Sequence, residues 1–134
     1  MSYELIINSP YCHDWMFSIT RKFLSPYATT ISLVKSNSIV AAISFDSYNG
    51  STLMHHLVIA KGHRVNRDFI KAIYAYAFID AKVNALIGII NPNNKKIRSI
   101  TKKLGYKEQC LIDENTLIIT LNKSDLSKTA GLLL

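Results

Sequence analysis

The sequence contains few cysteines, prolines and glycines, and it has no long uninterrupted apolar run. Its 134 residues include two cysteines, three prolines and five glycines. Cys12 and Cys110 stand alone, without the spacing of a metal site or a disulfide framework, so we expect two reduced thiols and a cytoplasmic protein without a metal. Polar residues interrupt the apolar stretch 72–90, which is too polar to cross a bilayer. We also expect no secretory signal, because residues 1–8 lack a basic region followed by an apolar core.

Acidic residues are scarce in one half of the chain. The sequence carries 16 Lys and Arg against nine Asp and Glu, a net charge of +7. Between Lys61 and Lys107, eleven basic residues stand against Asp68 and Asp80 only, a local charge of +9. This asymmetry indicates an anionic partner: a phosphorylated small molecule, nucleic acid or an acidic protein. A basic surface without a partner is the alternative. The bias to Ile, Asn and Lys is typical of an AT-rich genome, as in some bacteria and phages.

The apolar content is that of a folded chain. Hydrophobic residues make up 49% and charged residues 19%, which predicts one globular domain. We place this domain at residues 1–122 and a tail at 123–134. The tail ends in Leu132, Leu133 and Leu134, and we expect it to dock on its own domain or on a neighbouring subunit, because apolar residues are costly to leave in water.

Apolar periodicity predicts a mixed α/β (α+β) fold, with a mostly antiparallel sheet of about seven strands and about three helices. The continuous apolar run at 84–90 is typical of a fully buried strand in the middle of a sheet. Asn91 and Pro92 predict the start of the third helix, and Gly105 its end. The predicted strands are 3–7, 30–35, 39–46, 51–59, 84–90, 106–112 and 115–121, and the first two helices are 11–24 and 66–82.

A short basic turn joins the strand that ends at Ile59 to the second helix. It contains Lys61, Gly62, His63, Arg64 and Arg67. Backbone N–H groups at a helix N-terminus lack partners and carry partial positive charge, so basic side chains beside them favour a bound phosphate. Asn66 is the expected N-cap of that helix.

This order of elements, with a basic turn before the second helix, resembles the GNAT N-acetyltransferase superfamily over residues 3–121. The phosphate-binding motif of that family corresponds to Lys61, Gly62, His63, Arg64, Val65 and Asn66, with Arg64 in place of the central glycine. A second signature of the family is matched by Asn94, Ile97, Ile100, Lys103, Leu104, Gly105 and Tyr106.

The resemblance implies that acetyl-coenzyme A lies between the fourth and fifth strands. It also implies that backbone N–H groups of Val58, Ile59 and Ala60 contact the thioester carbonyl, that the basic turn with Val65, Asn66 and Arg67 binds the pyrophosphate, and that Asn94 belongs to the cofactor site. Many members carry a tyrosine that protonates the departing thiolate. Thr101 stands at that position, and an alkyl hydroxyl is a poor acid.

Two neighbouring histidines, His55 and His56, lie on the strand that would line the thioester. Because side chains alternate along a strand, the two imidazoles point to opposite faces and one of them faces the cleft. An imidazole titrates near neutral pH and suits a general base that deprotonates an amine. The competing interpretation is a histidine packed in the core.

Three functions remain open from the sequence. The first is transfer of an acetyl group from acetyl-coenzyme A to an amine acceptor. The second is an inactive GNAT-like domain that serves as a binding or assembly protein or as a homo-oligomer, which the absence of the central glycine and the tyrosine favours. The third is nucleic-acid binding, which the basic half favours, although no duplex-reading motif and no interleaved exposed aromatics accompany it. A membrane partner is not expected.

Overall fold

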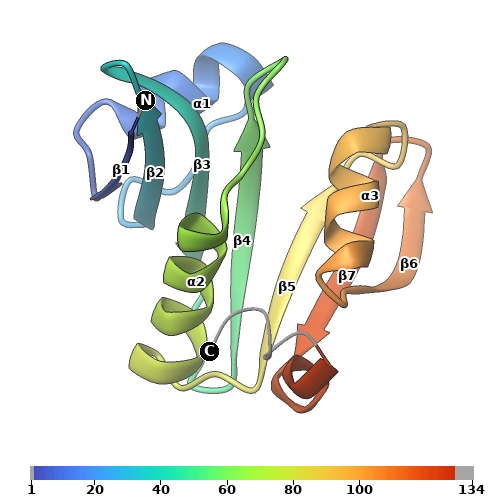
Figure 1. Cartoon of the computed structure of the whole chain (residues 1–134). Coiled ribbons are helices and arrows are strands. Elements are labelled where there is room, and N and C mark those ends of the chain that lie inside the picture. Colours follow the sequence, from blue (N-terminus) through green and yellow to red (C-terminus); the bar gives the residue numbers. More distant parts are fainter. Residues whose placement is uncertain (1, 129–134) are drawn as a thin grey trace.

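A computed structural model describes residues 2–128 and shows one seven-stranded sheet (Figure 1). The strand order is β1-β2-β3-β4-β5-β7-β6, and all neighbours are antiparallel except β4 and β5, which are parallel. The strands are β1 (Tyr3–Ile7), β2 (Thr29–Lys35), β3 (Ser38–Asp46), β4 (Thr52–Ile59), β5 (Ala85–Ile90), β6 (Lys107–Asp113) and β7 (Thr116–Asn122). The predicted fold class and the interior position of β5 are confirmed.

Helices cover the two faces of the sheet unequally. On one face, α1 (Cys12–Thr20) packs Cys12 and Met16 against Ala42 of β3 and Val58 of β4. On the opposite face lie α2 (Arg67–Tyr74) and α3 (Lys95–Lys103). They cover the main core, the larger cluster of buried apolar residues, which includes Phe45, Phe69 and Leu86. Strands β3 and β4 contribute to the main core and to the smaller cluster under α1, because their alternate side chains point to opposite faces.

Two helix boundaries differ from the sequence prediction. Helix α1 ends at Thr20 rather than at residue 24, because Arg21 turns into the left-handed region (φ 58°) and its N–H closes the helix on the Phe17 carbonyl. Helix α3 is capped by Asn94, whose side chain accepts from the Ile97 N–H at 3.1 Å. Asn91 instead accepts from the Asn93 N–H in a preceding turn. Gly105 follows α3 at φ 97°, as its predicted role in ending the helix requires.

The predicted second helix also changes its geometry midway. After Tyr74 the chain widens into a π-helix, η1 (Ala75–Asp80), where the Ala81 N–H donates to the Tyr76 carbonyl five residues earlier. Each hydrogen bond of a π-helix spans five residues instead of the four of the α-helix before it. The helix ends at residue 80, two residues before the predicted boundary.

Strand β5 alternates in burial instead of being buried on both faces. Leu86, Gly88 and Ile90 are buried, whereas Ile87 and Ile89 are partly exposed. The cause is the short first helix, because α1 packs against β3 and β4 and leaves that face of β5 open.

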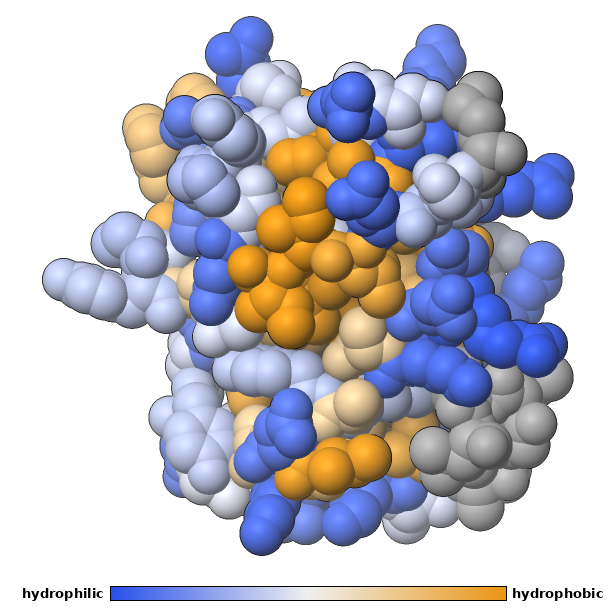
Figure 2. All heavy atoms as spheres, turned by 60° about the vertical axis from the view of Figure 1, so that its left-hand side comes forward, coloured by the Kyte–Doolittle hydropathy of each residue, from blue (hydrophilic) through white to orange (hydrophobic). Residues whose placement is uncertain are grey.

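Apolar side chains also lie exposed at the β1 edge. Leu5 pairs with Leu33 and Ile7 pairs with Ile31, so both extend the main core outward past α2. Ile7 is 67% exposed. Figure 2 shows the apolar surface that gathers on this side of the molecule, with polar residues around it.

The first six residues of the predicted tail form a 3₁₀ helix, η2 (Lys123–Lys128). Its Leu126 packs against the main core, and Asp125 pairs with Lys107 at 3.5 Å. The expectation that Leu132, Leu133 and Leu134 dock on the domain lies outside the described residues. Within the described range, the helices are too short or too polar to cross a membrane.

Candidate active site

A cleft opens where β4 and β5 stop pairing. Their parallel register runs from Thr52 opposite Ala85 to His55 opposite Gly88 and goes no further. Beyond this point the strands diverge (Figure 1), and the cleft between them has a volume of about 360 Å³. It is lined by Met16, Ile19, Thr20, Lys22, Leu24, His56, Leu57, Val58, Ile59, Ile89, Ile90, Asn91, Asn94 and Ile97.

His56 is the histidine of β4 that lines this cleft, on the face covered by α1. Its Nε2 lies 3.9 Å from Asp46 Oδ2, and its side chain is 29% exposed. Partial burial lowers the pKa of His56, Asp46 opposes this shift, and the charge of Lys22 adds to it. The imidazole is therefore largely neutral near pH 7, which is the form that accepts a proton.

His55 does not line the cleft. It is 1% exposed in the main core, and its Nε2 shares a hydrogen bond of 2.8 Å with Tyr106 Oη. Burial, with a smaller contribution from His56, lowers the pKa of His55 from 6.5 to about 3. Gly88 leaves room for the ring, because a Cβ at that position would lie 2.9 Å from His55 Cε1. A neutral, enclosed imidazole of this kind stabilises the fold and lies out of contact with a ligand in the cleft.

The backbone of β4 presents alternate N–H groups to the cleft. The Ala60 N–H donates to the Val40 carbonyl on β3 at 2.9 Å, so it is not available to a ligand. Because N–H groups alternate in direction along a strand, the Val58 N–H points the same way and those of Leu57 and Ile59 point toward β5. Ile59 is thus the residue of the expected Val58 to Ala60 set whose amide faces the cleft.

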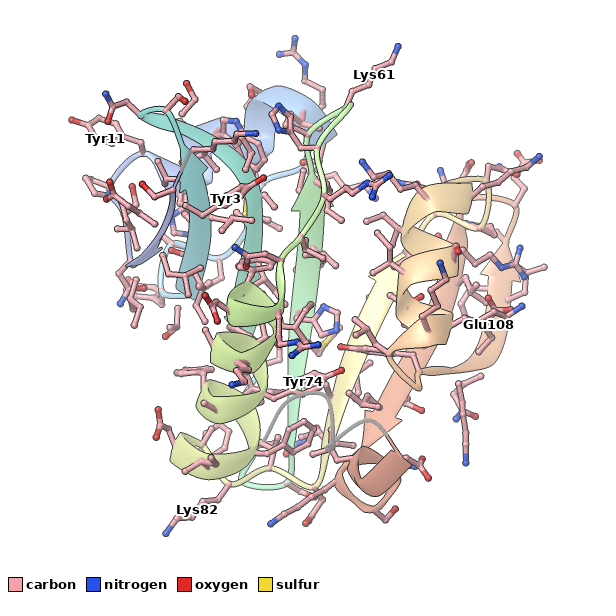
Figure 3. The ribbon with its side chains drawn as sticks, viewed as in Figure 1. Tyr3, Tyr11, Lys61, Tyr74, Lys82 and Glu108 are labelled. Atoms are coloured by element: carbon pink, nitrogen blue, oxygen red, sulfur yellow. The ribbon has the colours of Figure 1, made fainter. Side chains whose placement is uncertain are left out.

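The basic turn lies at the open end of the cleft, directly before α2. Gly62 has φ 82° and allows the reversal, while Lys61, Arg64 and Arg67 are exposed. Figure 3 shows Lys61 extending away from the molecule beyond β4. Arg64 is exposed and is not among the residues that line the cleft.

Three other residues of the predicted cofactor set have structural partners. Asn66 caps α2 by accepting from the Phe69 N–H at 2.8 Å. Val65 packs against the main core. The His63 carbonyl accepts from Lys96 Nζ, a contact that joins the turn to α3 across the end of the cleft. Asn94 has two roles, because it caps α3 and also lines the cleft.

The described cleft lining contains no phenol. Tyr74 and Tyr106 are buried, burial raises the pKa of both, and Tyr74 donates to the Leu104 carbonyl at 3.5 Å. Thr101 donates to the Ile97 carbonyl of its own helix. None of these hydroxyls is placed to protonate a thiolate in the cleft.

Sequence reasoning assigned to the site none of the residues with which α1 and the loop after it build one wall of the cleft. Met16 and Ile19 come from α1, and Lys22 and Leu24 come from the loop. The helical spacing of Met16 and Ile19 is visible in the sequence, but it predicts only that the helix has an apolar face. The strands that this face covers depend on where the helix ends. The helix ends in a left-handed turn at Arg21, and the sequence does not indicate this turn because the residue is not a glycine.

Comparisons with solved structures return N-acetyltransferases. The chain is similar to the Campylobacter jejuni N-acetyltransferase PseH in complex with acetyl coenzyme A, with 13% identity, a TM-score of 0.66, and 91% of this chain and 99% of that chain covered. It is also similar to the spermidine N-acetyltransferase SpeG of Vibrio cholerae (N152L mutant), with 10% identity, a TM-score of 0.75, and 96% and 98% covered. No family model and no curated protein matches the sequence. The chain therefore has the fold of the GNAT N-acetyltransferases, and it shares little sequence identity with these structures.

Proposed function

We propose that this protein transfers an acetyl group from acetyl-coenzyme A to an amine, with His56 as the general base. The observation that carries the proposal is the cleft between β4 and β5, which has a largely neutral imidazole on one wall and a basic turn at its open end. Similarity to PseH, whose complex contains acetyl coenzyme A, supports the choice of cofactor.

The residues present fit such a cofactor. Lys61 and Arg64 in the turn and Arg67 at the start of α2 are exposed and would supply positive charge for a pyrophosphate. The apolar walls suit an extended chain, and the facing edges of β4 and β5, unpaired with each other beyond His55, offer backbone groups for amide contacts. When bound, acetyl-coenzyme A supplies the activated acetyl group.

In this mechanism the acceptor nitrogen would attack the thioester carbonyl from the face of the cleft that α1 covers. The Ile59 N–H would donate to the carbonyl oxygen as charge develops on it. A C–N bond forms, the C–S bond breaks, and His56 takes the proton from nitrogen. A thiol has a pKa of about 8.5, so the thiolate leaves without an acid on the protein and is protonated by solvent.

Calorimetric titration with acetyl-coenzyme A tests the cofactor site. Arg64→Ala and Arg67→Ala should each weaken binding by about tenfold, because each removes a charge-assisted contact worth about 1.5–3 kcal/mol. Lys35→Ala, on β2 and away from the cleft, is the matched control. If the wild type binds nothing and Arg64→Gly binds, Arg64 blocks the site and the proposal fails.

A further inference from the structure

Lys22 lies at the point where the cleft meets the loop after α1. The helix end holds its backbone in place, because the Thr20 hydroxyl donates to the Met16 carbonyl at 3.0 Å and accepts from the Lys22 N–H at 3.2 Å. Its side chain lines the cleft together with His56, and its charge reaches the imidazole. A positive charge therefore acts on the proposed base from within the same cleft.

The ammonium of Lys22 has no acidic partner among residues 2–128. The described ion pairs are those of His56 with Asp46, Arg98 with Glu108 and Lys107 with Asp125. The part of the cleft that the structure describes is lined by no aspartate or glutamate. Asp46, the nearby carboxylate, contacts His56 instead.

This charge pattern opposes a polycationic acceptor. A polyamine places a second ammonium a few carbon atoms from the reacting nitrogen, and like charges within a partly desolvated cleft repel each other. A single ammonium matches a single negative charge, so it fits a carboxylate better than a phosphate dianion. The walls beside Lys22 are apolar: Met16, Ile19, Leu24 and Ile89.

We propose that the acceptor is an amine that carries a carboxylate next to the reacting nitrogen, as a free amino acid with an apolar side chain does. Lys22 binds the carboxylate, the wall formed by Met16, Ile19 and Leu24 receives the apolar side chain, and His56 accepts the proton of the amine. This inference rests on the proposed acetyltransferase function and adds the class of its acceptor.

The test compares free amino acids with their amides. Leucine, methionine and phenylalanine, the three corresponding amides and spermidine are each incubated with acetyl-coenzyme A, and kcat/KM is measured with the acetylated product identified by mass. We expect at least one of the three free amino acids to be acetylated. Lys22→Ala should lower kcat/KM for that amino acid by about tenfold or more, mainly by raising KM. The kcat/KM for the amides should change little in this variant. Because the variant and the wild type are compared on the same substrate, differences in intrinsic reactivity between the amines cancel.

Two variants make the result specific to charge. Lys22→Arg keeps the positive charge and should retain the preference for the acid, whereas Lys22→Glu should shift preference toward the amide or spermidine. Lys35→Ala removes a lysine away from the cleft and should leave every ratio unchanged. Lys22 is exposed and Lys35 is partly exposed, so the variants are expected to fold.

Failure of this inference and failure of the proposed function give different results. If acetyl-coenzyme A binds but amides or spermidine are preferred, or no carboxylate-bearing amine is acetylated, the acceptor class is wrong and the cofactor site stands. If acetyl-coenzyme A does not bind, the acetyltransferase proposal fails first. Equal losses on acids and amides in Lys22→Ala would also overturn the role of Lys22.

Discussion

At the scale of single residues, His55 and His56 are neighbours in the chain, yet their side chains lie in different environments on opposite faces of the sheet. Both follow the same strand, yet His55 is enclosed with Tyr106 while His56 faces the cleft beside Asp46. Burial lowers the pKa of both imidazoles, much further for His55. The proposed base is therefore the partly exposed histidine, because only it contacts a space large enough for substrate.

Replacing His56 by Gln tests the base. We expect kcat to fall by about 10²–10⁴-fold, the usual contribution of a general base, while affinity for acetyl-coenzyme A is unchanged. The wild-type kcat/KM should fall as pH drops through the pKa of His56, which lies below its ordinary 6.5, because the protonated ring cannot accept a proton. The variant should lose this acidic limb. A full pH profile measures both, and an unaltered rate in His56→Gln would remove this histidine from the mechanism.

The His55 and Tyr106 pair should make stability depend on pH. His55 has a pKa of about 3 in the folded chain against 6.5 ordinarily, so the unfolded chain binds the proton more readily. Its stabilising effect is complete above pH 6.5 and is lost as pH falls toward 3. Between pH 7 and pH 5 the free energy of unfolding should drop by about 2 kcal/mol from this group.

Urea unfolding at both pH values measures this loss. The double variant His55→Leu with Tyr106→Phe removes both polar groups, so it should stay close to wild type at pH 7 and lose less stability at pH 5. Tyr106→Phe alone leaves Nε2 without its partner and should cost about 1–3 kcal/mol at pH 7. A wild-type pH dependence equal to that of the double variant would contradict the assignment.

At the scale of secondary-structure elements, the cleft depends on where β4 and β5 separate. The last paired residues are His55 and Gly88, and the imidazole lies against the glycine. A side chain on Gly88 would meet both His55 and Ile119, at 2.9 and 3.0 Å. The buried ring is held by Tyr106 and cannot move aside without losing that hydrogen bond.

Gly88→Ala should therefore destabilise the fold by about 1–3 kcal/mol, as overpacking in a core does. Ala85→Gly, at the other end of the paired segment, is a control in which no side chain is added. Thermal unfolding of both variants, with acetyl-coenzyme A affinity of the folded protein, measures the effect. An unchanged melting temperature for Gly88→Ala would show that the core relaxes around the added methyl group.

At the scale of the whole molecule, charge is concentrated in the half that carries the basic turn and α3. Eleven basic residues between Lys61 and Lys107 stand against two acidic ones, and Lys61, Arg64, Lys95 and Lys96 are exposed at the open end of the cleft or on α3. Such a field would attract the anionic acetyl-coenzyme A of the proposed function over distances that salt screens.

Affinity for acetyl-coenzyme A should therefore fall as ionic strength rises. Between 0.05 and 0.5 M salt we expect a loss of about tenfold, because exposed charges at the turn are screened as the Debye length shortens. Titrations in sodium chloride at constant pH measure it, and binding of coenzyme A without the acetyl group is the comparison. Salt-independent affinity would place the phosphates away from the basic turn.

Local patterns determined most of the fold. Alternation and helical periodicity identified the strands and helices, and Asn66 and Gly105 took the terminal positions that their chemistry favours. The prediction that the third helix starts at Asn91 and Pro92 was wrong. The Asn91 side chain accepts from the Asn93 N–H in a turn, while Asn94 caps α3 and Ile97 packs on the core.

Only the tertiary structure decided which histidine meets the cleft and what stands beside it. Strand alternation requires that His55 and His56 face opposite ways, but the choice of face depends on the placement of α1 on one side and of α2 and α3 on the other. Lys22 is 34 positions from His56 in the chain and enters the cleft because Arg21 ends α1 early. Contacts between residues so distant in sequence arise from packing, which no local pattern encodes.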